Sequence, residues 1–134
     1  MRRSCLLWLA FVAGCSLPTS SSGDVADLRG TWAYTGTQSV PALQLAGTLS
    51  ITSQDGDLCG GTLTFTESDG LGGMRMDGGP VSGRVIERTD VDFDMLRSTG
   101  ARRHVARLRA DTIEGTWVQL SNGLSGQFRA VRTP

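Results

Sequence analysis

The chain divides into an apolar N-terminal run, a short polar spacer and a long region in which apolar and polar residues alternate. The run covers residues 5–13, and the spacer covers residues 16–23. From residue 28 onward, short blocks place an apolar side chain at every second position, which is typical of strands with one buried face. Several blocks open with a glycine, as in Gly30-Thr31-Trp32 and Gly61-Thr62-Leu63. A glycine on the buried face lets a sheet bend sharply and favours closure into a barrel.

The blocks and the turn signals between them predict eight strands. Asp55-Gly56 and Asn122-Gly123 are typical of tight hairpins, and the glycines around Met74 and Met76 predict a longer mobile loop from Glu67 to Pro80. The predicted strands cover residues 29–36, 43–53, 58–67, 80–88, 89–96, 101–109, 111–120 and 124–132. Eight short consecutive strands favour an all-β fold, a small eight-stranded antiparallel up-and-down barrel whose closure removes exposed edges.

Residues 101–110 allow a second interpretation, because they contain good helix formers and place apolar side chains at helical spacing. The aspartates that precede them alternate with apolar residues, as in a strand. A hairpin partner would set Arg103 and Arg107 across from those aspartates, which is a favourable cross-strand arrangement. We therefore expect a strand rather than a helix. The side chains directed inward would then be those of His104, Ala106 and Leu108.

The N-terminal run has the features of a cleaved export signal. Arg2 and Arg3 supply positive charge ahead of it, and its length is too short to span a bilayer of about 30 Å as a helix. Its last four residues, Val12-Ala13-Gly14-Cys15, resemble the lipobox of bacterial lipoproteins. The resemblance implies transfer of a diacylglycerol group to the Cys15 thiol and cleavage before Cys15. The two or three acyl chains of such a protein would anchor it firmly to a membrane.

The same resemblance implies an address in the bacterial cell envelope. In lipoproteins an Asp after the lipidated Cys implies inner-membrane retention, and the Ser16 found here implies the outer membrane instead. The expected organisation is a signal peptide at 1–14, a lipidated N-terminus and Ser-rich tether at 15–27, and a β-barrel domain at 28–134. An ordinary secretory signal with a chance Cys is the alternative interpretation.

Charge and cysteine content narrow the function classes. The chain has 13 basic and 13 acidic residues and no basic run, so it offers nucleic acid no electrostatic footprint. Cys59 would be the one thiol left unmodified after export, and we expect a small buried residue rather than a redox centre. A single His and a short turn at Asp55–Asp57 favour neither zinc nor calcium. We expect no metal, no cofactor and no catalytic residue, because no serine lies in a nucleophile motif.

Gly30-Thr31-Trp32 at the start of the predicted meander, with Gly115-Thr116-Trp117 near its end, resembles the calycin group of lipocalins and avidin-like barrels. The resemblance implies that Trp32 packs across the closed end of the barrel and that a cavity holds a small apolar or amphipathic ligand. The chain is shorter than full lipocalins, and no set of its residues matches a biotin site. The small barrel of bacterial metalloprotease inhibitors is similar too, but it carries a disulfide that this chain lacks.

Two functions are therefore expected, neither of them enzymatic. The first is a lipid-anchored, monomeric envelope lipoprotein whose barrel binds a small hydrophobic or amphipathic ligand. The second is a structural or interaction lipoprotein whose filled barrel contacts another envelope protein through its loops, chiefly Glu67 to Pro80. A void on the order of several hundred Å³ beside Trp32 or Trp117 would favour the first function. The candidate ligand-binding residues are Trp32, Tyr34, His104, Trp117 and Phe128. The same inward residues are equally expected if side chains simply fill the barrel.

Overall fold

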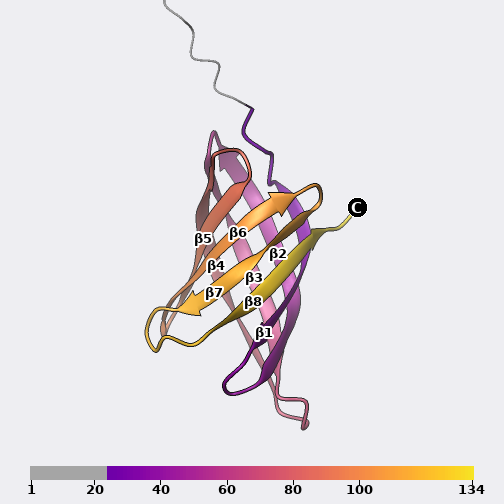
Figure 1. Cartoon of the computed structure of the whole chain (residues 1–134), viewed down its shortest axis with the longest axis vertical. Helices are drawn as coiled ribbons and strands as arrows, with labels where there is room; N and C mark the ends of the chain where they lie inside the picture. Colours follow the sequence, from indigo (N-terminus) through magenta and orange to yellow (C-terminus); the bar gives the residue numbers. More distant parts are fainter. Residues whose placement is uncertain (1–23) are drawn as a thin grey trace, which may run out of the picture.

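A computed structural model describes residues 24–134, which form a closed barrel of eight antiparallel strands (Figure 1). Each strand pairs with the next one in sequence, and β8 pairs with β1, so the ring of pairings is complete. The strands are β1 (Gly30–Gln38), β2 (Leu43–Asp55), β3 (Leu58–Ser68), β4 (Met74–Ile86), β5 (Asp90–Arg97), β6 (Gly100–Arg109), β7 (Thr112–Gln119) and β8 (Ser125–Arg132). The predicted all-β up-and-down barrel is confirmed. The predicted signal peptide and the lipidation site at Cys15 lie outside the described residues.

Period-2 alternation decides which side chains fill the barrel. In β1, Trp32 and Tyr34 are buried while Thr31, Ala33 and Thr35 are exposed. Except for Gly30, the glycines of the repeated blocks occupy inward positions where neighbouring backbones approach closely. A Cβ atom at Gly61, for example, would lie 1.8 Å from the carbonyl oxygen of Ser50. Glycine is therefore required at this point for the strands to curve into a closed sheet.

Residues 100–109 form strand β6, so the strand interpretation of this segment is confirmed and the helical one is wrong. The predicted charge ladder is present. Arg103 Nε lies 3.0 Å from Asp94 Oδ1, and Arg107 Nε lies 2.9 Å from Asp90 Oδ1. These pairs occupy the outer face of the barrel, while the opposite face of β6 is turned inward. A strand places the charged side chains of this segment outside the barrel and its core side chains inside. A helix would leave the aspartates of β5 without these partners.

The predicted long loop from Glu67 to Pro80 is wrong. Strand β3 continues to Ser68 and β4 begins at Met74, which leaves residues 69–73 as the turn. Glycine and proline here are strand residues. Gly79 is needed because a Cβ atom would lie 1.9 Å from the carbonyl oxygen of Leu96. Pro80 precedes Val81, which is the first residue of β4 to pair with β5. The N–H that proline lacks therefore falls at the end of the β4–β5 ladder.

The barrel has two distinct ends. We call the end at which the chain enters β1 the closed end. Its turns are residues 56–57, 87–89 and 110–111. The open end carries the other four turns, at 39–42, 69–73, 98–99 and 120–124. Both limits of the described chain lie at the closed end, where the C-terminus is marked in Figure 1. The open end therefore faces away from both of them.

The closed end is sealed around Trp32, which is 0% exposed. Its Nε1–H donates to the carbonyl oxygen of Leu28 at 3.0 Å. The guanidinium of Arg132 covers the indole ring and donates to the carbonyl oxygens of Arg29 and Asp27 at 2.6 and 2.7 Å. The entering segment is thus held across the base of the barrel by one tryptophan and one arginine, as the calycin resemblance implies for Trp32.

Candidate functional site

The middle of the barrel is filled by an aromatic layer. The hydroxyl oxygen of Tyr34 lies 3.2 Å from His104 Nε2, and the His104 ring stacks on Phe93 with centroids 4.2 Å apart. Phe128 stacks on Tyr34 at 5.5 Å and meets the edge of His104 at 4.9 Å. All four side chains are buried. At this level the side chains occupy the space that a ligand would need.

Burial controls the ionisation of the layer. Loss of water contact, and then the positive charge of Arg102, lowers the pKa of His104 from 6.5 to about 3. Burial also raises the pKa of Tyr34. At neutral pH the two groups therefore share a hydrogen bond as uncharged partners, one of them donating and the other accepting.

A hollow of about 310 Å³ lies at the open end, above the aromatic layer. Most of its walls come from the inward positions of the strand ends, where mostly polar side chains lie between the hollow and the aromatic layer. Its lining includes Gln38, Leu43, Glu67, Arg97, Arg102 and Gln119. The hollow thus combines a polar floor inside the barrel with access from the open end.

Arg102 forms the centre of that floor. Its side chain is 3% exposed, and its guanidinium carbon lies 4.1 Å from the ring centre of Trp117 and 5.1 Å from that of Phe65. Its Nη2 atom donates to Glu67 Oε1 at 3.3 Å. Burial, and then the nearby charge of Arg97, lowers the pKa of Arg102. The aromatic rings hold the guanidinium flat, and its Nε donates to Gln119 at 3.5 Å, so Nη1 is the one nitrogen of this group without a partner.

A second buried arginine lies beside the first. The side chain of Arg97 is 8% exposed and pairs with Asp77, and its Nη1 atom donates to Gln119. The more exposed Arg75 approaches both acids, at 3.5 Å from Asp77 and 3.9 Å from Glu67. Three guanidinium groups therefore share two carboxylates.

Two buried donors of this cluster have no hydrogen-bond partner: Nη1 of Arg102 and Nε of Arg97. Buried polar groups in proteins nearly always have partners, because an unpaired one costs free energy. Both atoms belong to charged side chains at the same hollow. The pair marks this hollow as a place where an acceptor group would be stabilised.

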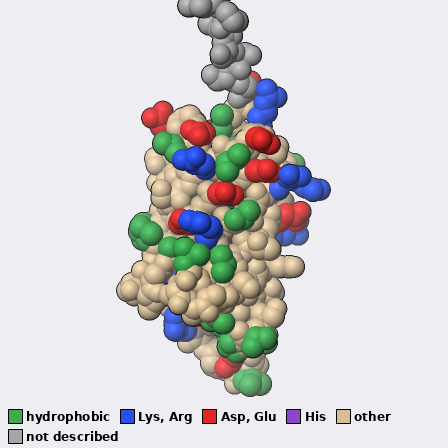
Figure 2. Space-filling model, turned by 60° about the vertical axis from the view of Figure 1, so that its left-hand side comes forward, with side chains coloured by type: hydrophobic (Ala, Val, Ile, Leu, Met, Phe, Trp, Pro, Cys, Tyr) green, Lys and Arg blue, Asp and Glu red, His purple; other side chains and the backbone are tan. Residues whose placement is uncertain are grey.

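Exposed apolar side chains lie on two of the hairpins at the open end. Among the described residues, the four most exposed large hydrophobic side chains are Leu71, Met76, Val40 and Met74, at 92, 81, 77 and 74%. All four lie in or next to the turns of the open end. Figure 2 shows apolar side chains at the end of the molecule opposite the grey chain. We call these four residues the apolar rim.

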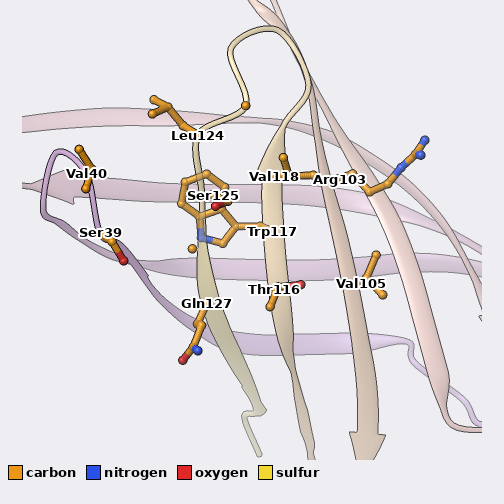
Figure 3. Close-up of a pocket in the computed structure, with 12 residues that line it drawn as sticks. Ser39, Val40, Arg103, Val105, Thr116, Trp117, Val118, Leu124, Ser125 and Gln127 are labelled. Carbon is orange, nitrogen blue, oxygen red and sulfur yellow. The ribbon is translucent and has the colours of Figure 1, made fainter.

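A second hollow, of about 680 Å³, lies on the outer face of β7 and β8 beside Trp117 (Figure 3). Val40 and Val118 contribute to its walls. Its charged residue, Arg103, points away from Trp117 in Figure 3 and is paired with Asp94. Because this groove lacks an unpaired buried charge, we take the open-end hollow as the better candidate site.

The structure brings together three of the five predicted ligand-binding residues. Tyr34, His104 and Phe128 meet in the aromatic layer, and Trp117 lies against Arg102 at the open end. Trp32 lies apart from them at the closed end. Ligand binding by these five residues stays a prediction.

Sequence reasoning missed the charged residues of the open-end hollow. Arg102 precedes His104 by two positions in β6, so the alternation that turns His104 inward also turns Arg102 inward. Glu67 and Arg97 follow the inward positions of β3 and β5 in the same way. The signal was therefore present, but charged residues near strand ends are ordinarily taken as solvated.

Residues 24–134 contain neither a metal-binding cluster nor a membrane-spanning helix. No group of three or more His, Cys, Asp or Glu side chains in this part of the chain could hold a metal ion. Within the same residues, no helix is long and apolar enough to cross a membrane.

Comparison with known proteins concerns the fold. No protein-family model matches the sequence, and no curated protein matches it. Among solved structures, a de novo designed fluorescence-activating β-barrel matches with a TM-score of 0.61 and 21% identity over 78% of this chain and 93% of its own. EF1p2_mFAP2b bound to DFHBI matches with a TM-score of 0.66 and 15% identity, over 79% and 94% of the two chains. The redesigned barrel mFAP1 bound to DFHBI gives 0.66 and 15%, over 78% and 94%. This chain shares with them the eight-stranded antiparallel β-barrel fold.

Proposed function

We propose that this protein is a non-enzymatic, lipid-anchored envelope lipoprotein whose barrel binds a small amphipathic molecule at its open end. The observation that carries the proposal is the open-end hollow of about 310 Å³, with polar donors inside and the apolar rim outside. Its volume lies at the lower limit of the range usual for ligand pockets, about 300–1,000 Å³. A molecule with one polar end and one apolar end matches both parts.

Structural neighbours support the binding role. Two of the designed barrels that share this fold are described as bound to DFHBI, a small molecule. An eight-stranded barrel is wide enough to hold one small ligand where its interior is not completely filled. In this chain the aromatic layer fills the middle, so the ligand would occupy the open end.

Sequence and fold together support the anchored arrangement. The lipobox-like residues that end at Cys15 precede the barrel, and the described chain enters the barrel at its closed end. A lipid at Cys15 would therefore hold the closed end nearer to the membrane. The open end would face the aqueous space, where it could exchange a ligand with another carrier.

Binding can be tested with a pair of neighbouring variants. Thr99 contributes to the lining of the hollow, whereas Ser98, beside it in the same turn, does not. The full chain is titrated with octanoate and 1-octanol, and binding is followed by ligand-observed NMR. We expect Thr99→Trp to fill the hollow and abolish binding, and Ser98→Trp to bind like the wild type. Absence of binding to the wild type, together with no small molecule in native mass spectrometry of the purified protein, would refute the binding role.

The anchor has its own test. Cells that express the protein are labelled with palmitate, and the membrane fraction is analysed. We expect the wild type and Cys59→Ser to be labelled, and Cys15→Ser to be unlabelled and uncleaved. If Cys15→Ser is processed to the same size and remains in the membrane, the lipoprotein proposal is wrong.

Contact with another envelope protein is the second candidate, favoured by the exposure of Leu71 and Met76. Apolar and methionine-rich surfaces of this kind adapt readily to partners. In this case Leu71→Ser would abolish co-purification of a partner protein, whereas octanoate binding would be absent in the wild type.

A further inference from the structure

We infer that the open-end hollow recognises the carboxylate of an amphipathic ligand, with Arg102 as its main contact and Arg97 as a second. This inference rests on the proposed binding function and names the chemical class of the ligand. The carboxylate would lie inside the barrel, and the apolar part would extend past Leu43 toward the apolar rim.

The two arginines have hydrogen-bonding capacity left over. Nη1 of Arg102 and Nε of Arg97 have no hydrogen-bond partner, and both side chains are more than nine-tenths buried. A neutral hydroxyl could satisfy one such donor. A carboxylate offers two acceptor oxygens and matches the planar fork of a guanidinium, so it could satisfy donors from both residues.

The charges around the hollow also favour an anion. The side chains of Arg75, Arg97 and Arg102 surround those of Glu67 and Asp77, so the cluster carries one positive charge in excess. The buried charges of Arg97 and Arg102 are balanced by Glu67 and Asp77, so the excess charge lies on Arg75, whose side chain lines the hollow and is 66% exposed. At this position it attracts an anion and repels a cation. An anion would restore the balance, whereas a cationic ligand would add a second uncompensated charge.

Arg102 is also held rigidly. Its guanidinium is held against Trp117, with Phe65 on a second side, so it presents its edge in a fixed plane. A fixed donor loses little conformational freedom when a ligand binds, which favours recognition of a planar group. Glu67 already uses one edge of this guanidinium through Nη2 and so competes with an incoming carboxylate.

The test compares three probes that share one apolar chain: octanoate, 1-octanol and octylammonium. Each is titrated into the full chain, and binding is followed by ligand-observed NMR and by tryptophan fluorescence, because Trp117 lies against Arg102. We expect octanoate to bind at least about tenfold more tightly than octanol, as charge-assisted hydrogen bonds do against neutral ones. Octylammonium is expected to bind most weakly.

Variants assign the effect to its residues. Arg102→Met should weaken octanoate about tenfold or more and leave octanol nearly unchanged. Arg103→Met, one residue along β6 on the outer face, is the matched control and should bind octanoate like the wild type. Glu67→Gln removes the competing carboxylate and should tighten octanoate several-fold, which gives a positive readout even if Arg102→Met does not fold.

The outcomes separate the inference from the function on which it rests. If octanoate and octanol bind equally and Glu67→Gln changes neither, carboxylate recognition is overturned while ligand binding stands. If octylammonium binds most tightly, recognition of an anion by this hollow is overturned. If no probe binds the wild type and native mass spectrometry of the purified protein finds no small molecule, the binding function itself fails.

Discussion

The guanidinium carbon of Arg132 lies 4.2 Å from the centre of the Trp32 ring, and this contact joins the last strand to the first at the closed end of the barrel. The same guanidinium donates to two carbonyl oxygens of the segment that enters the barrel. One side chain thus closes the sheet and fixes the chain that precedes it. Barrel closure at this end depends on a few specific contacts rather than on apolar area alone.

Arg132→Met should therefore lower the free energy of unfolding by about 1–3 kcal/mol, through loss of a cation–π contact and two hydrogen bonds. Urea denaturation followed by circular dichroism measures the change. Arg129→Met is the matched control, because Arg129 lies on the same strand with its side chain exposed. Equal stability of the two variants would show that Arg132 contributes no more than an ordinary surface arginine.

Gly61→Ala should be strongly destabilising, by about 2–4 kcal/mol, because its Cβ atom would lie 1.8 Å from the carbonyl oxygen of Ser50. The neighbouring Gly60 offers a direct comparison. There the nearest atom to a new Cβ is the Ser53 hydroxyl oxygen at 3.0 Å, which can rotate away. We expect Gly60→Ala to cost less than about 1 kcal/mol in the same denaturation experiment. A similar loss for both variants would contradict the role of close strand approach at Gly61.

His104 should make the barrel less stable in acid. Its pKa in the folded protein is about 3, against 6.5 when unperturbed, so between these values the unfolded chain binds a proton that the folded chain does not. Its contribution is complete above pH 6.5 and is lost as the pH falls toward 3. Between pH 7 and pH 5 the loss amounts to about 2 kcal/mol.

Denaturation of wild type and His104→Gln at both pH values isolates this effect. The glutamine can still bond to Tyr34 but does not titrate in this range, so the variant should lose about 2 kcal/mol less than the wild type on acidification. Parallel pH dependences of the two proteins would show that His104 is not the source.

Thiol counting tests the two cysteines of the predicted mature chain. Burial raises the pKa of Cys59 and restricts access to it, so a thiol-reactive dye should label the native protein slowly at pH 8. In urea the lipidated protein should yield one reactive thiol, because a thioether at Cys15 does not react. Two thiols per chain in urea would contradict lipidation at Cys15.

The fold could be predicted from the sequence because the alternation of apolar and polar residues is a local signal that is present in every strand. The ion pairs of Arg103 with Asp94 and of Arg107 with Asp90 followed from pairing β5 with β6. The first half of β4 could not be predicted. There Gly79 and Pro80 have the composition of a loop, and their place in a strand depends on contacts with β3 and β5 that are distant in sequence.

The candidate site was predictable in part. The aromatic residues of the interior follow from alternation, and so does the inward direction of Arg102. Alternation does not predict that Arg102 pairs with Glu67, 35 residues away, or that Nη1 of Arg102 is left without a partner. Which interior charges are satisfied depends on the register of every strand around the barrel, so it becomes visible only when the barrel is closed.

The position of the C-terminus has a practical consequence. Thr133 donates its backbone N–H to Thr31 at 2.9 Å, so the chain leaves the barrel beside its first strand, at the end opposite the open-end hollow. A C-terminal tag can therefore attach the protein to a sensor surface with the hollow directed into the flowing solution. The same attachment would permit a fluorescent protein or a second barrel to be fused without obstructing entry of a ligand.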